Sequence, residues 1–257
     1  MSYNGYKDNF LNKNFDYIVS ASIKEYDMRD AGFNILISEG ALNQRTIDYL
    51  AGLPKQVRKI KLGLMQKENK ELTKIQNEGF RKYRKLFLEA NELTDDNIIS
   101  VHKDAIIVVN KRITKTKFDT VEFRPKERYS SYYHINNCEY YYSKLTNDLS
   151  IKGLGKSTSK PYIYHKEYMI KTIKKIIKLN EVSRKSACIY LRDFMDKYRK
   201  MELKMEYYRE LNNTPYFTYI LFDHVLQLED PDPILEDCID INYNYDNILM
   251  EFVRMIY

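Results

Sequence analysis

The stretch IISVHKDAIIVV, residues 98–109, decides the fold that the sequence predicts. Two short apolar runs rich in β-branched residues flank a polar centre made of His102, Lys103 and Asp104. Apolar runs of this length on either side of a polar turn are typical of a hairpin of two buried strands. We therefore predict a hairpin whose tight turn carries Asp104.

A second strand is predicted well upstream of this hairpin. The segment FDYIVSASIKEYDM (15–28) contains a short apolar run that ends at an acidic residue, Asp27, as a buried strand would. The segment DAGFNILISEGAL (30–42) then reads as a turn into a short helix.

Helices fill the interval between the predicted strand and the predicted hairpin. Asn43 is a suitable N-cap for a helix through TIDYLAGL (46–53). Residues 55–91 form a long helical stretch with an apolar stripe, and breaks are expected near Gly63 and Asn69.

The chain after the hairpin changes from strands to helices. Residues 118–154 hold four segments rich in β-branched and aromatic residues, separated by turn signals. Two segments with apolar residues at helical spacing follow at 165–180 and 183–211, and Ser183 is a plausible N-cap for the second. The sequence therefore predicts an α+β fold with a helical module after the sheet.

The net charge of +6 is distributed very unevenly. Residues 124–209 carry 20 Lys and Arg against 9 Asp and Glu, whereas residues 210–253 carry 10 acidic residues and no Lys or Arg. A basic excess confined to one segment is the pattern of a phosphate-binding surface, although solvated helix faces are often rich in lysine as well.

Composition argues against several classes of protein. The three cysteines lie 50 residues apart, which is neither a disulfide framework nor zinc-ligand spacing, and the four histidines form no HExxH pair. No apolar stretch approaches the roughly 20 residues needed to span a bilayer, and the N-terminus lacks a signal-peptide core. We expect an intracellular, cytoplasmic protein without a membrane partner.

Two carboxylates stand out by their positions in the predicted elements. Asp27 ends the predicted strand and Asp104 lies in the hairpin turn. Acidic groups in such places are costly unless they are solvated, paired or bound to a cation. Two aspartates side by side hold Mg²⁺ through hard oxygen ligands, as in the two-metal arrangement for phosphoryl transfer. The alternative is an ordinary solvated turn aspartate, which is common in proteins.

The order of these features resembles the palm and thumb of a family B DNA polymerase. YDMRDAGFNIL (26–36) resembles that family's first palm motif, with Asp27 at the metal-binding aspartate. The predicted hairpin resembles the second carboxylate motif, with Asp104 at its second aspartate and His102 in place of the first. The resemblance implies that Asp27 and Asp104 are catalytic and bind Mg²⁺.

The same resemblance assigns binding roles to basic residues and one tyrosine. VRKIKLGLM (57–65) lies where the family has its fingers helix, so that Arg58 and Lys61 are expected to contact the incoming triphosphate, although the family's Asn and Tyr-Gly are absent. Residues 126–155 resemble the segment with a Lys-x-Tyr motif that grips the primer strand. The residues implied in nucleic-acid binding are Lys126, Arg128, Tyr129, Lys152, Lys171, Lys174, Lys175, Arg184 and Lys185.

The resemblance also implies a domain organisation. A palm-like domain of residues 1–155, with an antiparallel sheet, packed helices and reduced fingers at about 40–70, is followed by a basic thumb-like helical module at 156–211 and an acidic segment at 212–257. Because few residues precede Asp27, we expect the family's exonuclease and N-terminal domains to be supplied by another chain. We therefore expect a minimal or split polymerase of viral or mobile-element origin, acting on primer–template DNA with a second subunit.

Two other functions remain open at this point. The chain is alternatively a palm-derived protein that has lost catalysis and binds nucleic acid or a replication complex. It is alternatively a protein-interaction factor, whose acidic segment after Glu210 docks on a basic partner or shields its own basic surface.

Overall fold

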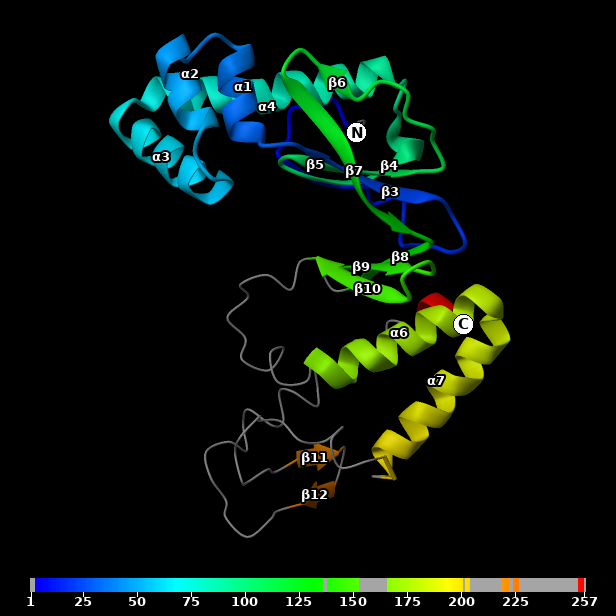
Figure 1. The fold of residues 1–257 in the computed structure, drawn as a ribbon. Coiled ribbons are helices and arrows are strands. Elements are labelled where there is room, and N and C mark those ends of the chain that lie inside the picture. Colours follow the sequence, from blue (N-terminus) through cyan, green and yellow to red (C-terminus); the bar gives the residue numbers. More distant parts are fainter. Residues whose placement is uncertain are drawn as a thin grey trace. The chain divides into compact units, whose positions relative to one another are not determined.

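The computed structural model describes residues 3–135, 138–152, 166–200, 202–203, 219–221, 224–226 and 254–256 (Figure 1). The chain divides into two compact units. The first comprises Met1–Asn14 and Ala21–Arg128, and the second comprises Phe15–Ser20 and Tyr129–Tyr257.

The first unit is built on a six-stranded sheet with the strand order β1-β4-β5-β3-β7-β6. Its strands are β1 (Asn9–Leu11), β3 (Ile23–Met28), β4 (Ile98–His102), β5 (Ala105–Val109), β6 (Lys117–Phe118) and β7 (Val121–Tyr129). The pairs β1–β4, β4–β5, β3–β5 and β6–β7 are antiparallel. The predicted hairpin is confirmed, because β4 and β5 are joined by the two-residue turn Lys103–Asp104.

Helices lead from β3 to the hairpin, as the sequence predicts. They are α1 (Ala31–Ser38), α2 (Gln44–Ala51), α3 (Lys55–Glu68) and α4 (Lys70–Ala90), followed by the 3₁₀ turn η1 (Asp95–Asn97). The Asn43 side chain accepts a hydrogen bond from the Thr46 amide, which confirms the predicted cap of α2.

The long helical stretch breaks once instead of twice. Asn69 separates α3 from α4 and caps α4 by accepting a hydrogen bond from the Glu71 amide, so the break expected there is confirmed. The break expected near Gly63 is wrong, because this glycine lies inside α3. A single glycine costs a helix only about 1 kcal/mol, which the neighbouring turns of α3 outweigh.

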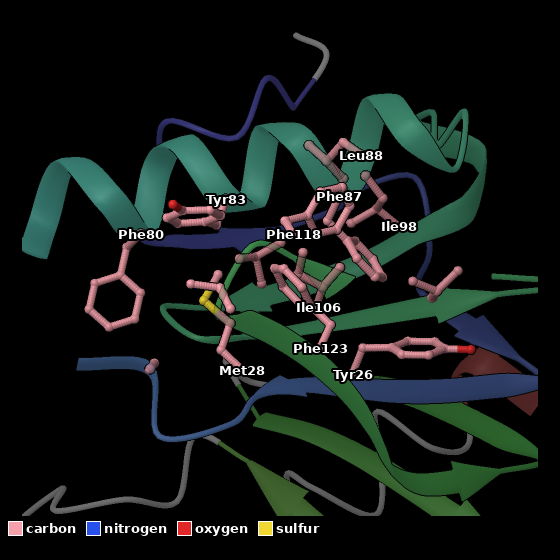
Figure 2. Close-up of a cluster of buried hydrophobic side chains, with 14 of the residues drawn as sticks. Tyr26, Met28, Phe80, Tyr83, Phe87, Leu88, Ile98, Ile106, Phe118 and Phe123 are labelled. Carbon is pink, nitrogen blue, oxygen red and sulfur yellow. The ribbon is translucent and has the colours of Figure 1, made fainter. Parts of the chain in front are cut away.

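Helix α4 contributes buried side chains to the core of the first unit, together with the strands of the sheet. Its buried aromatic side chains lie against side chains of the sheet, with the rings of Phe87 and Phe123 stacked at 4.3 Å between centroids (Figure 2). Gly79 of α4 brings α1 close, since a Cβ at this position would lie 2.1 Å from Cγ2 of Ile35. The helix that follows β3 is thereby packed closely on α4.

The second unit has a four-stranded sheet with the order β10-β9-β8-β2. Its strands are β2 (Tyr17–Ile18), β8 (Ser131–Ile135), β9 (Cys138–Ser143) and β10 (Asp148–Lys152), and all three neighbouring pairs are antiparallel. The helices α6 (Lys166–Val182) and α7 (Arg184–Arg199) follow, and β11 (Tyr219–Leu221) pairs with β12 (His224–Leu226). Ser183 caps α7, as predicted, by accepting a hydrogen bond from the Ser186 amide.

A tyrosine-rich core joins this second sheet to the two helices. Tyr133, Tyr140 and Tyr142 are buried in one cluster with Ile176 of α6 and Leu191 of α7. Burying rings of this size against two amphipathic helices is a large apolar contribution to stability.

The fold class is α+β, as the sequence predicts. The contacts group residues 129–152 with the helices of the second unit, whereas the sequence analysis placed the boundary near residue 155. Most of the predicted acidic segment, 212–257, lies outside the described residues.

Candidate functional site

A cavity of about 270 Å³ lies in the first unit, where β3 ends, the β4–β5 turn reverses the chain and α1 and α3 approach. Polar and charged side chains dominate its lining. The lining residues are Asp27, Met28, Asp30, Ala31, Gly32, Phe33, Lys55, Arg58, Lys59, Leu62, Gln66, Gln76, Phe80, Lys103 and Asp104.

The structure brings the two predicted carboxylates, Asp27 and Asp104, to this cavity. Asp27 lies near the end of β3 and pairs in register with Ala105 of β5. The Met28 amide donates a hydrogen bond to the carbonyl of Asp104 at 2.9 Å. Two residues 77 positions apart in the chain are therefore fixed side by side by backbone pairing.

A buried arginine, Arg84 of α4, holds the turn that carries Asp104. Its side chain is fully buried and donates to the carbonyls of Gly5 and Lys103 and to the carboxylate of Asp8. Lys103 itself has a φ of 47°, in the left-handed region that two-residue hairpin turns require. The position of Asp104 thus depends on contacts far from it in sequence.

The electrostatics of Asp27 are those of a carboxylate crowded by its neighbours. Burial raises the pKa of Asp27 above its usual value, and the negative charge of Asp104 raises it further. The positive charge of Lys126 opposes this shift. A cation bound between Asp27 and Asp104 would relieve the repulsion between them.

The donor set at this pair fits Mg²⁺ bound together with a phosphate ligand. The described part of the chain contains no group of three or more His, Cys, Asp or Glu side chains placed to hold a metal ion. Magnesium commonly uses only one or two protein carboxylates and takes its other ligands from water and substrate phosphates. Asp27 and Asp104 would supply the protein ligands.

Helix α3 presents its cations to the cavity along one face. Lys55, Arg58 and Lys59 line the cavity, and Leu62 and Gln66 continue that face at helical spacing. Arg58, which the sequence predicts as a triphosphate contact, is therefore at the cavity. Lys61 is exposed and is not among the lining residues, because it lies on another side of α3.

Arg58 already has two partners within the cavity. Its guanidinium lies 3.2 Å from the carboxylate of Asp30 and 5.0 Å from the ring centre of Phe33. Lys55 pairs with the other oxygen of Asp30 at 3.4 Å. Lys59 makes no hydrogen bond or ion pair with any described residue.

Strand β7 carries three more of the predicted residues. Lys126 pairs with the buried carboxylate of Glu25 at 3.5 Å, and the negative charge of Glu25 is the main reason that the pKa of Lys126 is raised. Arg128 is exposed. Tyr129 is only 6% exposed and its ring packs on Tyr141, so its described contacts are those of a core residue.

The remaining predicted residues belong to the second unit. The ammonium of Lys152 lies over the ring of Tyr141 at 5.6 Å. On α6, Lys171 and Lys175 are exposed and Lys174 is half-buried.

Two further predicted residues lie at the start of α7. Arg184 donates a hydrogen bond to the carbonyl of Ile256. Lys185 is exposed and lines a pocket of α7 together with Ile189 and Arg192.

Three charged residues of the cavity had no predicted role in the site: Asp30, Lys55 and Lys103. Lys59 was recognised with Arg58 and Lys61 as a source of positive charge, but it was not among the residues chosen to contact the triphosphate. Helical spacing from Leu62, the one buried residue of α3, would have identified the face that carries Lys55 and Lys59. Nothing local indicates that Asp30 faces those cations.

The fold and site define an α+β protein in which two neighbouring carboxylates and a set of cations line one cavity. The chain belongs to the family of the Bacteriophage PBS1 gene 130 protein, whose family model matches residues 1–256. No curated protein matches the chain. Among the described residues, no helix combines the length and apolar character needed to cross a membrane.

Proposed function

We propose that this chain is a nucleotidyltransferase subunit of a phage DNA polymerase, and that the cavity of the first unit is its active site. The observation that carries the proposal is that Asp27 and Asp104, brought together by the backbone, line the same cavity as Lys55, Arg58 and Lys59. Carboxylates and cations that line one small cavity suit a metal-bound polyphosphate.

In this reaction a primer 3′-hydroxyl attacks the α-phosphorus of a nucleoside triphosphate. The new P–O bond forms as the bond to the β-phosphate breaks, and pyrophosphate leaves. Bound Mg²⁺ would polarise the attacking hydroxyl and neutralise charge on the leaving group.

The residues of this chain would orient the reactants. Asp27 and Asp104 would position the primer 3′-hydroxyl and the α-phosphate that it attacks. Lys59 and Lys103 bind phosphate oxygens, and the N-terminal end of α3, which begins at Lys55, adds the favourable end of a helix dipole. Negative charge builds up on the leaving pyrophosphate in the transition state. The lysines and the helix end would stabilise that charge.

The second unit is proposed to bind duplex DNA through its backbone. Lys171, Lys175 and Lys178 are exposed on α6 at a spacing of four and three residues, so they share one face of the helix. A row of lysines contacts phosphates without reading sequence. A polymerase requires this kind of contact with primer–template.

The experiment is template-directed incorporation in an extract of infected cells from which the chain has been removed. Wild-type protein added back should restore incorporation, whereas Asp27→Asn and Asp104→Asn should reduce it by at least about a hundredfold. Asp119→Asn, which removes a carboxylate that is not part of the cavity lining, is the matched control. Full restoration by both cavity variants would rule out the proposal.

A catalytically inactive DNA-binding protein is the second candidate. It is favoured by the ion pairs of Asp30, which engage two of the cavity's cations. In that case the chain binds primer–template with a steep salt dependence but neither binds Mg²⁺ nor restores incorporation.

A further inference from the structure

Asp30 is an acidic residue that lines the cavity and lies beside two of its cations. Its Oδ2 is 3.2 Å from Arg58 and its Oδ1 is 3.4 Å from Lys55, so one carboxylate engages two of the four cations that line the cavity. The Asp30 side chain is 18% exposed and that of Arg58 is 15% exposed. Charge pairs that are mostly removed from water interact more strongly than surface pairs.

Hydrogen-bond capping of α1 does not explain the carboxylate of Asp30. The residue occupies the N-cap position of α1, yet its side chain makes no capping hydrogen bond. Its φ of 43° is left-handed, a conformation that Asn and Asp both tolerate. The carboxylate of Asp30 instead forms its ion pairs with Lys55 and Arg58 of α3.

We propose that Asp30 is an internal competitor for phosphate, and that it makes the cavity select a triphosphate chain over a single phosphate. This inference rests on the proposed function, because it takes the cavity to be the phosphate site. Lys59 and Lys103 are not paired with Asp30 and give a polyphosphate its first contacts. Only an anion long enough to reach Lys55 or Arg58 as well gains enough binding free energy to displace the carboxylate of Asp30 from these cations.

The position of Arg58 makes this exchange feasible without rearrangement of α3. Its guanidinium is held over the ring of Phe33 at 5.0 Å as well as by Asp30. A guanidinium stacked on an aromatic ring has a second attraction that holds it there besides its ion pair. Arg58 would therefore remain in the cavity and accept a phosphate oxygen in place of the carboxylate.

The test compares the binding of inorganic triphosphate and of orthophosphate to the full chain by calorimetry, without divalent metal and at low salt. Asp30→Asn keeps the side-chain shape and the left-handed backbone but removes the charge. We expect it to bind triphosphate about tenfold more tightly, and to bind orthophosphate with a larger relative gain, so that selectivity falls. Lys59→Gln, made as a single substitution with Asp30 retained, should weaken triphosphate binding.

Asp119→Asn is the matched control, because Asp119 also has a left-handed φ, of 54°, in the same unit but does not line the cavity. Equal tightening by this control would show an effect of net charge alone and overturn the inference. Unchanged affinities in Asp30→Asn would mean that Asp30 only links α1 to α3, and would overturn the inference. If Asp30→Asn does not fold, Asp30→Ser replaces it in the same measurement.

The assay separates this inference from the proposed function. Tighter triphosphate binding by Asp30→Asn supports the competitor role even if no incorporation is ever observed. Unchanged binding removes the role even if the chain proves to be a polymerase.

Discussion

Arg84 and Lys103 are joined by a hydrogen bond of 2.6 Å from the guanidinium of Arg84 to the carbonyl of Lys103. Arg84 belongs to α4 and is fully buried, and Lys103 precedes Asp104 in the β4–β5 turn. The helix that supplies the core of the first unit therefore also fixes the turn of the candidate site. The side chain of Arg84 thus links the packing of α4 to the position of the turn that carries Asp104.

Replacement of Arg84 by methionine should destabilise the chain strongly. The variant leaves the carbonyls of Gly5 and Lys103 without their donor and removes the partner of Asp8. Removing charge-assisted hydrogen bonds from buried groups costs about 3 kcal/mol in free energy of unfolding. Urea denaturation measures this cost. Arg81→Met, on the exposed side of the same helix, is the control, and equal stability of both variants would refute the role of Arg84.

Two glycines in helices should respond to alanine in opposite ways. Gly79→Ala would place a Cβ 2.1 Å from Ile35, which is completely buried, so α1 and α4 must move apart at a cost of about 1–3 kcal/mol. Gly63→Ala meets no atom within 4 Å and should raise stability by about 0.5–1 kcal/mol. Thermal unfolding of both variants gives the comparison. A stabilised Gly79→Ala would show that the helices do not pack as described.

The stability of the wild-type chain should carry a pH-dependent contribution from Asp27. Burial and then the charge of Asp104 raise the pKa of Asp27 above its usual value of 3.8. A carboxyl with a higher pKa in the folded state binds more protons when folded, so its contribution to stability falls as pH rises from the unfolded pKa through the folded one.

Asp27→Asn removes that loss of stability. The variant should therefore have a higher Tm than wild type at pH 7, with a difference that shrinks as pH is lowered toward about 4. Scanning calorimetry at several pH values follows this trend. If Asp27→Asn were less stable than wild type at pH 7 but equally stable at about pH 4, the pH dependence would be opposite to the one predicted, and the raised pKa of Asp27 would be refuted.

The lysines of α6 should determine how DNA affinity depends on salt. Lys171, Lys175 and Lys178 lie on one face of the helix. The plot of log affinity against log salt has a negative slope, and each phosphate contact that is lost makes this slope less steep by about 0.9. The triple change to glutamine should reduce both affinity and slope for any DNA sequence. Lys197 and Lys200 already pair with Asp193 and Asp196 on α7 and provide the control substitutions. An unchanged slope in the triple variant would exclude α6.

The elements predicted from local signals are mostly those that local interactions determine. The β4–β5 hairpin, the Asn43 cap and the break at Asn69 each follow from residues within a few positions of one another. Pairings between distant segments left no such signal. Strand β2 pairs with β8, joining Tyr17 to Tyr133, and nothing near either tyrosine indicates the other.

The candidate site divides in the same way. Strand ends and turn chemistry drew attention to Asp27 and Asp104, and the antiparallel register of β3 with β5 explains why they meet. Which lysines of α3 face the cavity depends on how α3 packs, so the sequence could not separate Lys59, which lines the cavity, from Lys61, which does not. The assignment of Tyr129 to nucleic acid likewise ignored the ring of Tyr141, on which it packs.

The most direct test of the central claim is the binding of Mn²⁺, a spectroscopic substitute for Mg²⁺, measured by electron paramagnetic resonance with a mixture of the four deoxynucleoside triphosphates. The account predicts that the full chain binds Mn²⁺ in a nucleotide-dependent way. Asp27→Asn and Asp104→Asn should each weaken that binding by at least about tenfold, while Asp119→Asn leaves it unchanged. Wild-type affinity in both cavity variants, or no nucleotide-dependent Mn²⁺ binding by the wild-type chain, would contradict the claim that Asp27 and Asp104 form a metal-dependent nucleotidyl-transfer site.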